Sequence, residues 1–210
     1  GLNVEAFEEQ TRQGLDKANE GYRLGAHFIA SGRSPHAGRE GDIREELIAR
    51  FQTKSQTAYG DYAYVDLSNL DLSGIDLTGA YLEYADLTNT NLSNASLSKA
   101  ILTHAIVRNT VFTNTNLTGA NLGAIHFIGA RFSNADLTGA TLGKSIIENT
   151  RFEQCRLAAK SDMFLETEFR NAQFIESDLS KSVFIDADIS QCDFSGSNLN
   201  ETSFLNPVME

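Results

Sequence analysis

Apolar residues recur at every fifth position over most of the chain. If the third residue of each group of five is taken as its centre, the centres run in steps of five from Tyr62 to Leu157 and, after two additional residues, from Phe164 to Phe204. All 29 centres are Leu, Phe, Ile, Val or Tyr, and the position two before the centre is Ala, Ser, Thr, Cys or Gly in 24 of the 29 groups. A helix repeats every 3.6 residues and a strand every two, so neither produces these two columns, one of large apolar residues and one of small residues, that recur every five positions.

A chain that turns a corner after every five residues explains both columns, because it points one large and one small side chain inward on each side. The remaining positions hold Asn, Asp, Ser, Thr and Gly, which suit tight turns. The recurrent motif A-(D/N)-L-(S/T)-x, as in residues 85–89, resembles the pentapeptide-repeat family over about 145 of the 210 residues. The resemblance implies a mainly β protein, a right-handed quadrilateral parallel β-helix with four repeats per coil. About seven coils, ~4.8 Å apart, are then expected here.

The first 58 residues lack the repeat. We therefore expect an N-terminal helical cap or attachment over residues 1–58, the β-helix over 59–206 and a short tail over 207–210. The N-terminal segment serves either as a cap that covers the open edges of the first coil or as a helical pair that binds a partner.

Two helices are predicted within this N-terminal segment. Apolar residues at helical spacing, among them Phe7 and Tyr22, predict an amphipathic helix over residues 4–30. Asp42 followed by Glu45 has the form of a capping box and predicts that a second helix begins there and runs through Phe51.

The repeat is interrupted near residue 160. Asp162 stands where a small residue is expected, and two extra residues predict a bulge. The register is ambiguous at this point, because Ser161-Asp162-Met163 also fits the motif and would leave Phe164 as a second insertion. The bulge is either a tolerated interruption or a contact loop.

The negative charge belongs to the repeats. The chain carries a formal net charge of −11, of which residues 61–209 contribute nine Lys and Arg against eighteen Asp and Glu, or −9. This balance disfavours direct binding to nucleic acid or to an anionic membrane, because phosphate binding requires a basic surface. A protein partner with a basic surface is expected instead. The sequence opens with no signal peptide and contains no apolar run of membrane-spanning length, so a cytoplasmic location is expected.

A period of 20 residues per coil sorts the outward side chains by wall. The first wall, centred on Leu82 and Leu102, is predicted to carry an exposed apolar stripe, which a helix or a partner would cover. The members of this stripe are Tyr64, Tyr81, Tyr84, Ile101, Met163, Leu165, Val183 and Ile185. The second and third walls, centred on Leu67 and Leu72, are acidic toward both ends and mixed in the middle. The candidate partner-binding residues on them are Asp66, Asp71, Asp86, Glu168, Asp188 and Asp193.

The sequence offers little catalytic chemistry. The four histidines, His27, His36, His104 and His126, have no metal-ligand spacing. Cys155 and Cys192 occupy the small inward position and are interpreted as buried substitutes for alanine. Carboxylates are expected to lie on flat outer walls where no pocket perturbs their pKa. We therefore predict no catalytic residue, no cofactor, no metal and no enzymatic activity.

Three functions remain open. The first is a non-enzymatic protein-interaction module or scaffold that presents the walls of an acidic solenoid, with a homodimer through an end coil or the N-terminal helices as one possibility. The family resemblance implies a second, a DNA mimic that binds a type II topoisomerase (DNA gyrase) and modulates it or protects it from inhibitors. The dimerising C-terminal helix common among such members has no counterpart after Phe204. The third is a targeting or immunity module cut from a larger protein.

Overall fold

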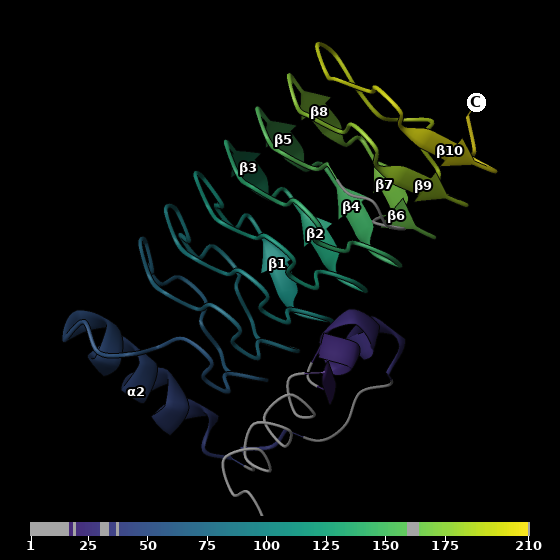
Figure 1. The fold of residues 1–210 in the computed structure, drawn as a ribbon. Coiled ribbons are helices and arrows are strands. Elements are labelled where there is room, and N and C mark those ends of the chain that lie inside the picture. The colour runs from purple at the N-terminus through teal and green to yellow at the C-terminus, as the bar shows by residue number, and fades with distance from the viewer. Residues whose placement is uncertain (1–16, 19, 30–33, 37, 159–163, 210) are drawn as a thin grey trace, which may run out of the picture.

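Residues 57–158 and 164–208 form a parallel β-solenoid. The computed structural model describes residues 17–18, 20–29, 34–36, 38–158 and 164–209. Successive coils stack along one axis (Figure 1). Backbone bridges join residues 20 positions apart on four walls, as in Asp61 with Tyr81 and Asp66 with Asp86. Each coil therefore consists of four repeats, and the predicted fold class is confirmed.

The regular strands gather on three of the four walls, and all pairs are parallel. The second wall holds the sheet β1-β2-β4-β7, the third wall β3-β5-β8 and the first wall β10-β9-β6. Their bounds are β1 Ile106–Arg108, β2 His126–Ile128, β3 Arg131–Ser133, β4 Ile146–Glu148, β5 Arg151–Glu153, β6 Phe164–Leu165, β7 Glu168–Arg170, β8 Gln173–Ile175, β9 Val183–Ile185 and β10 Ser203–Leu205. The fourth wall, centred on Leu77 and Leu97, is joined by single bridges among the described residues.

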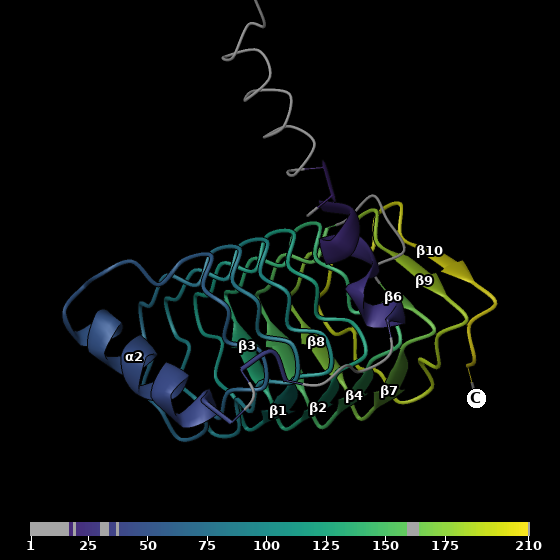
Figure 2. The ribbon, with the colours of Figure 1, turned by 90° about the horizontal axis from the view of Figure 1, so that it is seen from below.

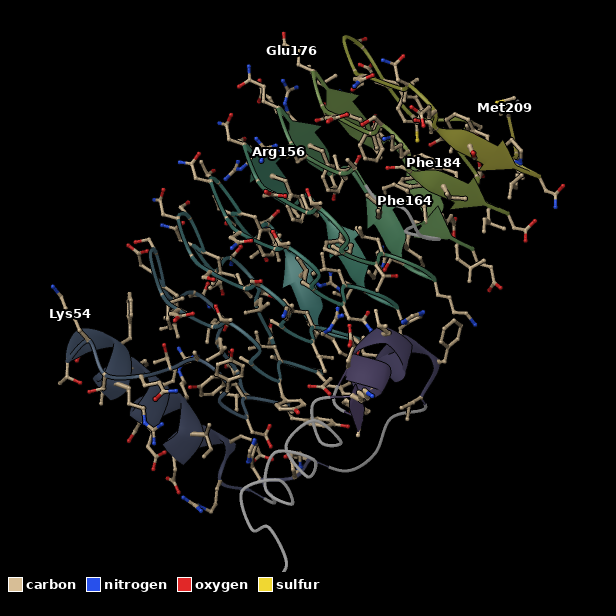
Figure 3. The ribbon with its side chains drawn as sticks, viewed as in Figure 1. Lys54, Arg156, Phe164, Glu176, Phe184 and Met209 are labelled. Carbon is tan, nitrogen blue, oxygen red and sulfur yellow. The ribbon has the colours of Figure 1, made fainter. Side chains whose placement is uncertain are left out.

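The centres of the repeats build the core. Every centre from Tyr62 to Phe184 is buried, and phenylalanines stack on one another from coil to coil. On the third wall the ring centroids of Phe132 and Phe152 lie 4.6 Å apart. Figure 3 shows Phe164 and Phe184 inside the stack, with Glu176 at the surface. Stacked coils thus share one continuous hydrophobic interior.

Hydroxyl side chains at the small inward position also donate hydrogen bonds to backbone carbonyls. The Thr90 hydroxyl donates to the carbonyl of Leu67 at 2.8 Å, and the Thr110 hydroxyl donates to that of Leu87 at 2.7 Å. A buried hydroxyl without a partner would cost free energy, so these bonds explain why threonine and serine are accepted beside alanine.

The corners use left-handed backbone. In the described residues, the second residue after every centre but Ile189 has positive φ, as in Asn69 (60°) and Asn89 (56°). Asn tolerates this region better than other side chains do, because its short polar side chain bonds locally. Asn89 also donates from its amide to Asn69 Oδ1 at 3.0 Å, which links the corners of two coils.

The number of equivalent coils is lower than expected. About five turns keep an unbroken 20-residue spacing up to the insertion, rather than the about seven expected over the whole solenoid. The insertion raises the spacing to 22 for one coil, as in Ile146 with Glu168, after which it returns to 20. Phe164 is fully buried and pairs with Phe184, so it is the centre of its repeat. The bulge itself and Asp162 lie outside the described residues.

Helix α2 (Glu40–Gln52) lies across the N-terminal end of the solenoid (Figures 1 and 2). Leu47 belongs to the core cluster, and Ile43 and Phe51 pack against it. The predicted capping box at Asp42 is wrong. The helix begins at Glu40 with Arg39 as N-cap and no side-chain cap, and Asp42 lies within the first turn, where a carboxylate complements the helix dipole.

The predicted first helix is described only in part. Residues 17–18 and 20–25 are helical, and a 3-10 turn, η1 (Ala26–Phe28), follows. The part of the prediction before residue 17 lies outside the described residues. At the other end of the chain, a bridge from Asp188 to Val208 carries the backbone ladder two residues past the boundary expected at 206.

The two cysteines occupy the small inward column, and burial raises the pKa of the Cys155 thiol to about 11 and of the Cys192 thiol to about 12. At pH 8 we expect both to react with Ellman's reagent at least roughly 100-fold more slowly than free cysteine, because the thiolate is the nucleophile. Unfolding in guanidinium should restore the rate of free cysteine. A native rate equal to that of the unfolded chain would contradict this placement.

Candidate interaction surfaces

The aspartates of the second and third walls shape the backbone. Oδ1 of Asp86 accepts a hydrogen bond from the backbone N–H of Thr88 at 2.8 Å, and Oδ1 of Asp193 accepts one from Ser195 at 2.9 Å. Asn91 makes the same turn with Ser93 at 3.0 Å. These are Asx turns, a structural role that the sequence interpretation missed although the D/N column of the repeat indicated it.

The turns also keep these carboxylates ionised. Hydrogen bonds from Ser73 lower the pKa of Asp71, those from Ser190 lower that of Asp188, and those from Ser195 lower that of Asp193. A carboxylate that accepts such bonds favours its charged form. The acidic columns therefore hold their charge over the physiological pH range.

Two of the six candidate acids are engaged by basic side chains of the same chain. Arg44 of α2 donates to the backbone carbonyl of Asp66 and lies 3.4 Å from its Oδ1. Arg170 donates to Glu168 at 2.6 Å. The structure therefore divides the predicted set: Asp66 holds α2, Glu168 belongs to an ion pair, and Asp71, Asp86, Asp188 and Asp193 stay at the surface without an ion pair among the described residues.

The middle of these walls is mixed, as expected. Arg151 bonds Glu153 at 3.2 Å, and Arg170 also lies 3.7 Å from Glu148. Arg131 and Arg151 are paired neighbours on the third wall. The acidic surface is thus two separate zones, one near each end.

The N-terminal segment 20–29 lies along the first wall (Figure 2). Tyr22 donates to Glu83 at 2.8 Å, and the side-chain amide of Asn121 donates to the backbone carbonyl of Arg23. His27 is buried against Gly123, where an added Cβ would stand 2.6 Å from the His27 Cβ. Glycine is therefore required at position 123 for this close approach.

The predicted apolar stripe is not one continuous exposed surface. Ile101 is buried, and Tyr64, Tyr81 and Tyr84 are half-buried beside the N-terminal segment. Leu165, Val183 and Ile185 are half-buried on β6 and β9, and Met163 lies outside the described residues. Sheet pairing brings Leu165 beside Ile185. The stripe thus has a tyrosine-rich part near α2 and an aliphatic part toward the C-terminus.

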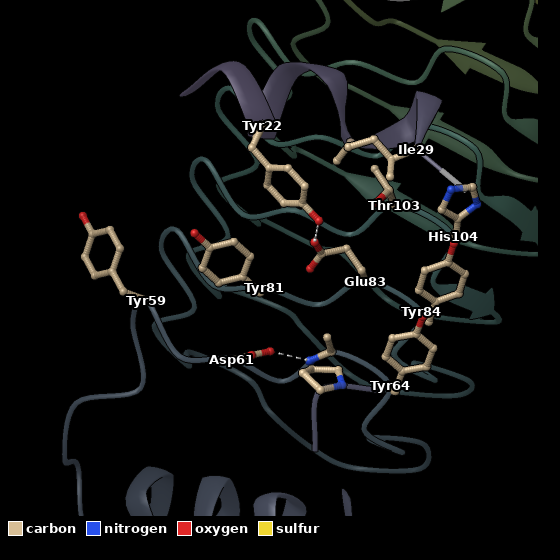
Figure 4. A pocket seen from close by; sticks show the side chains of 13 residues that line it. Tyr22, Ile29, Tyr59, Asp61, Tyr64, Tyr81, Glu83, Tyr84, Thr103 and His104 are labelled. Carbon is tan, nitrogen blue, oxygen red and sulfur yellow. Dashed lines mark hydrogen bonds between the residues drawn. The ribbon is translucent and has the colours of Figure 1, made fainter. Parts of the chain in front are cut away.

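A pocket of about 610 Å³ opens between the N-terminal segment and the first coils (Figure 4). The expectation that no pocket perturbs a carboxylate is wrong here, because burial raises the pKa of Glu83. The sequence interpretation assigned no role to Glu83, Asp61, Tyr22 or His104. The available signal was the run of aromatic residues at corner positions 64, 84 and 104, because the same corner in later coils carries Ala124, Lys144, Glu166, Asp186 and Asn206.

Other kinds of site are not found in the described part of the chain. No three His, Cys, Asp or Glu side chains there lie close enough together to hold a metal ion. Among the same residues, no helix combines the length and the apolarity that a membrane span requires.

The bridges, buried centres and corner residues define a four-walled β-solenoid built from five-residue repeats. Two family models match it: pentapeptide repeats, in overlapping copies that cover residues 63–124, and the pentapeptide repeat region, over residues 125–204. Together they cover more than half of the chain. The chain belongs to the pentapeptide-repeat family.

Several solved structures are similar to this chain. HetL, a pentapeptide repeat protein involved in heterocyst differentiation regulation from Nostoc sp. strain PCC 7120, is 17% identical, with 79% of this chain and 96% of HetL covered and a TM-score of 0.34. A pentapeptide repeat protein of the Arabidopsis thaliana thylakoid lumen is 25% identical over 55% of this chain and 68% of its own (TM-score 0.34).

The plasmid-mediated fluoroquinolone resistance protein QnrB1 is 17% identical, with 65% of this chain and 92% of its own covered and a TM-score of 0.34. No curated protein sequence matches. The family assignment rests on the two family models, and the low identities and TM-scores of these structures carry no argument about function.

Proposed function

We propose that this protein is a non-enzymatic interaction module whose acidic zones on the second and third walls bind a basic surface of a protein partner. The observation that carries this proposal is the set of aspartates whose carboxylates are fixed in Asx turns, such as Asp86, Asp188 and Asp193. Fixed carboxylates cost little conformational entropy on binding, and their field attracts a basic partner.

Charge density favours this general role over DNA mimicry. Residues 61–209, at 20 residues and ~4.8 Å per coil, span roughly 35 Å, which gives one net charge per ~4 Å. Duplex DNA carries one per about 1.7 Å. The basic residues in the middle of the third wall, Arg131 and Arg151, interrupt the acidic surface further.

A triple variant tests the proposal: Asp86→Asn, Asp188→Asn and Asp193→Asn. Asparagine retains the turn, as Asn91 shows, so the change removes charge and leaves the fold intact. With a fluorescent decalysine peptide as the basic probe, we expect affinity to fall roughly tenfold in low salt, since each exposed ion pair contributes up to about 1 kcal/mol.

The matched control removes the same charge elsewhere, through Glu45→Gln, Glu46→Gln and Glu201→Gln, all at exposed positions. Equal losses in the two triple variants would mean that only net charge matters and would refute the acidic zones as the binding surface. Circular dichroism melting verifies that both variants fold.

DNA mimicry remains the alternative, because the solenoid is a narrow acidic rod. Its test is DNA gyrase supercoiling measured with and without the purified protein, alone and in the presence of a fluoroquinolone. Inhibition or protection at micromolar concentration that the Asp86, Asp188 and Asp193 triple variant loses would favour the alternative. No effect on gyrase would eliminate it and leave the general module.

A further inference from the structure

Tyrosines gather at the pocket on the first wall. The chain contains six tyrosines, and five of them line the pocket: Tyr22, Tyr59, Tyr64, Tyr81 and Tyr84. Figure 4 shows Tyr22 of the N-terminal segment and Tyr81 on one side of the Glu83 carboxylate and Tyr64 and Tyr84 on the other, with Tyr59 at the outer edge of the pocket. The phenylalanines of the repeats, in contrast, stack in the core. Tyrosines, whose rings carry a polar hydroxyl group, are therefore concentrated at this solvent-accessible pocket.

The aromatic rings occupy costly backbone positions. Tyr64, Tyr84 and His104 lie at consecutive left-handed corners with φ of 63°, 59° and 61°. Their rings stack, with centroids 4.6 Å apart for the two tyrosines and 4.8 Å apart for Tyr84 and His104. Positive φ is common to the corners of this solenoid, but the aromatic residues that adopt it in the described part of the chain are Tyr59, Tyr64, Tyr84 and His104, and all four line the pocket.

The unsatisfied polar atoms of the described residues converge on the same pocket. Glu83 is 7% exposed; its Oε1 accepts from Tyr22, while its Oε2 is buried without a hydrogen-bond partner. Nε2 of His104, on the pocket wall, is likewise buried and unpartnered. Nε2 of His36 lies 3.4 Å from Oδ1 of Asp61, which also lines the pocket. A buried acceptor without a partner calls for a donor that the protein does not supply.

The charges of the pocket define what that donor is. Glu83 and Asp61 are its acids, and its described lining includes no lysine or arginine. An anion would be repelled, and a purely apolar ligand would leave Oε2 of Glu83 unsatisfied. Tyrosine faces and a carboxylate together attract an organic cation, because the ring quadrupole and the negative charge act in the same direction.

We propose that this pocket binds an organic ammonium or guanidinium group. The cation lies against the ring face of Tyr81 and donates to Oε2 of Glu83, while Tyr22 holds the other carboxylate oxygen in place. The site is separate from the acidic zones of the second and third walls, so a result against either proposal leaves the other unaffected.

Tyrosine fluorescence reports on this pocket directly, since the chain has no tryptophan. We expect n-butylammonium and n-butylguanidinium at pH 8 to change this fluorescence in a saturable manner. The neutral n-pentanol should bind at least roughly tenfold more weakly, because it lacks the charge.

Two blocked tripeptides, Gly-Lys-Gly and Gly-Arg-Gly, identify the source of the cation. Binding tighter than that of the free amines assigns the pocket to a basic side chain of a peptide, and weaker binding assigns it to a small molecule.

Glu83→Gln is the decisive variant. The glutamine carbonyl still accepts from Tyr22, but the charge is lost, so cation affinity should fall at least roughly tenfold. Asp136→Asn removes one charge on the fourth wall and should leave affinity unchanged.

If Glu83→Gln fails to fold by circular dichroism, Tyr81→Leu replaces it, with a loss of about threefold or more expected. Equal binding of n-pentanol and n-butylammonium, or undiminished affinity in the folded variant, overturns the proposal. Decalysine binding to the acidic zones should be unaffected by Glu83→Gln.

Discussion

Replacing Phe152 with alanine is expected to lower the free energy of unfolding by about 3–5 kcal/mol. Phe152 is fully buried, and its ring stacks between Phe132 at 4.6 Å and Phe174 at 4.8 Å. The loss combines the transfer of a large side chain with a cavity that two stacked coils cannot collapse to fill. Guanidinium unfolding followed by circular dichroism measures the change. Because domains of this kind are stable by only about 5–15 kcal/mol, the effect should be large.

Phe152→Leu is the matched control. Leucine already occupies the same column in earlier coils, at Leu72 and Leu92, so the backbone accepts it. Its cost should be roughly 1–2 kcal/mol, clearly below that of alanine. If the two variants were equally destabilised, lost volume and the resulting cavity would not be the source of the effect at this coil.

The second large effect is expected at the N-terminal end of the solenoid. Leu47 is fully buried between α2 and the first coil, so Leu47→Asp should cost about 4 kcal/mol or detach the helix. Detachment exposes the edge of the first coil, which is a template for association with other chains. We expect faster trypsin cleavage after Arg44 and Arg50 and a higher mass in light scattering.

Ala49→Asp adds the same charge at an exposed position of the same helix and should change neither measurement. Unaltered proteolysis and mass in Leu47→Asp would show that burial of Leu47 is not required to dock α2. The ion pair between Arg44 and Asp66 alone would then be responsible for docking the helix.

The repeat pattern carries most of the fold. Centres such as Leu67 and Phe127 are buried as predicted, because a five-residue period leaves a large side chain no other direction once four corners close a coil. Phe164 was ambiguous because residues 158–163 contain two more residues than the repeat needs. Only its pairing with Phe184 fixes the register.

The surfaces were less predictable than the core. Asp66 and Glu168 were expected to face a partner, but Arg44 and Arg170 engage them. The repeat period predicts which wall of the solenoid a side chain points from. It cannot predict contacts with α2, because this helix lies outside the repeat and no period relates residue 44 to residue 66. The start of α2 was misplaced for a similar reason: Arg39 and Glu40 open the helix without the side-chain cap on which the prediction relied.

Sequence by itself determined the five-residue turn of the chain, the two inward columns and the acidity of the walls, because each is a local consequence of side-chain size and charge repeated along one axis. Tertiary structure alone decided the pocket. Tyr22 and Glu83 are 61 residues apart, and their hydrogen bond exists because the N-terminal segment folds back along the first wall. That contact buries one carboxylate among tyrosines and changes a surface acid into a candidate cation site.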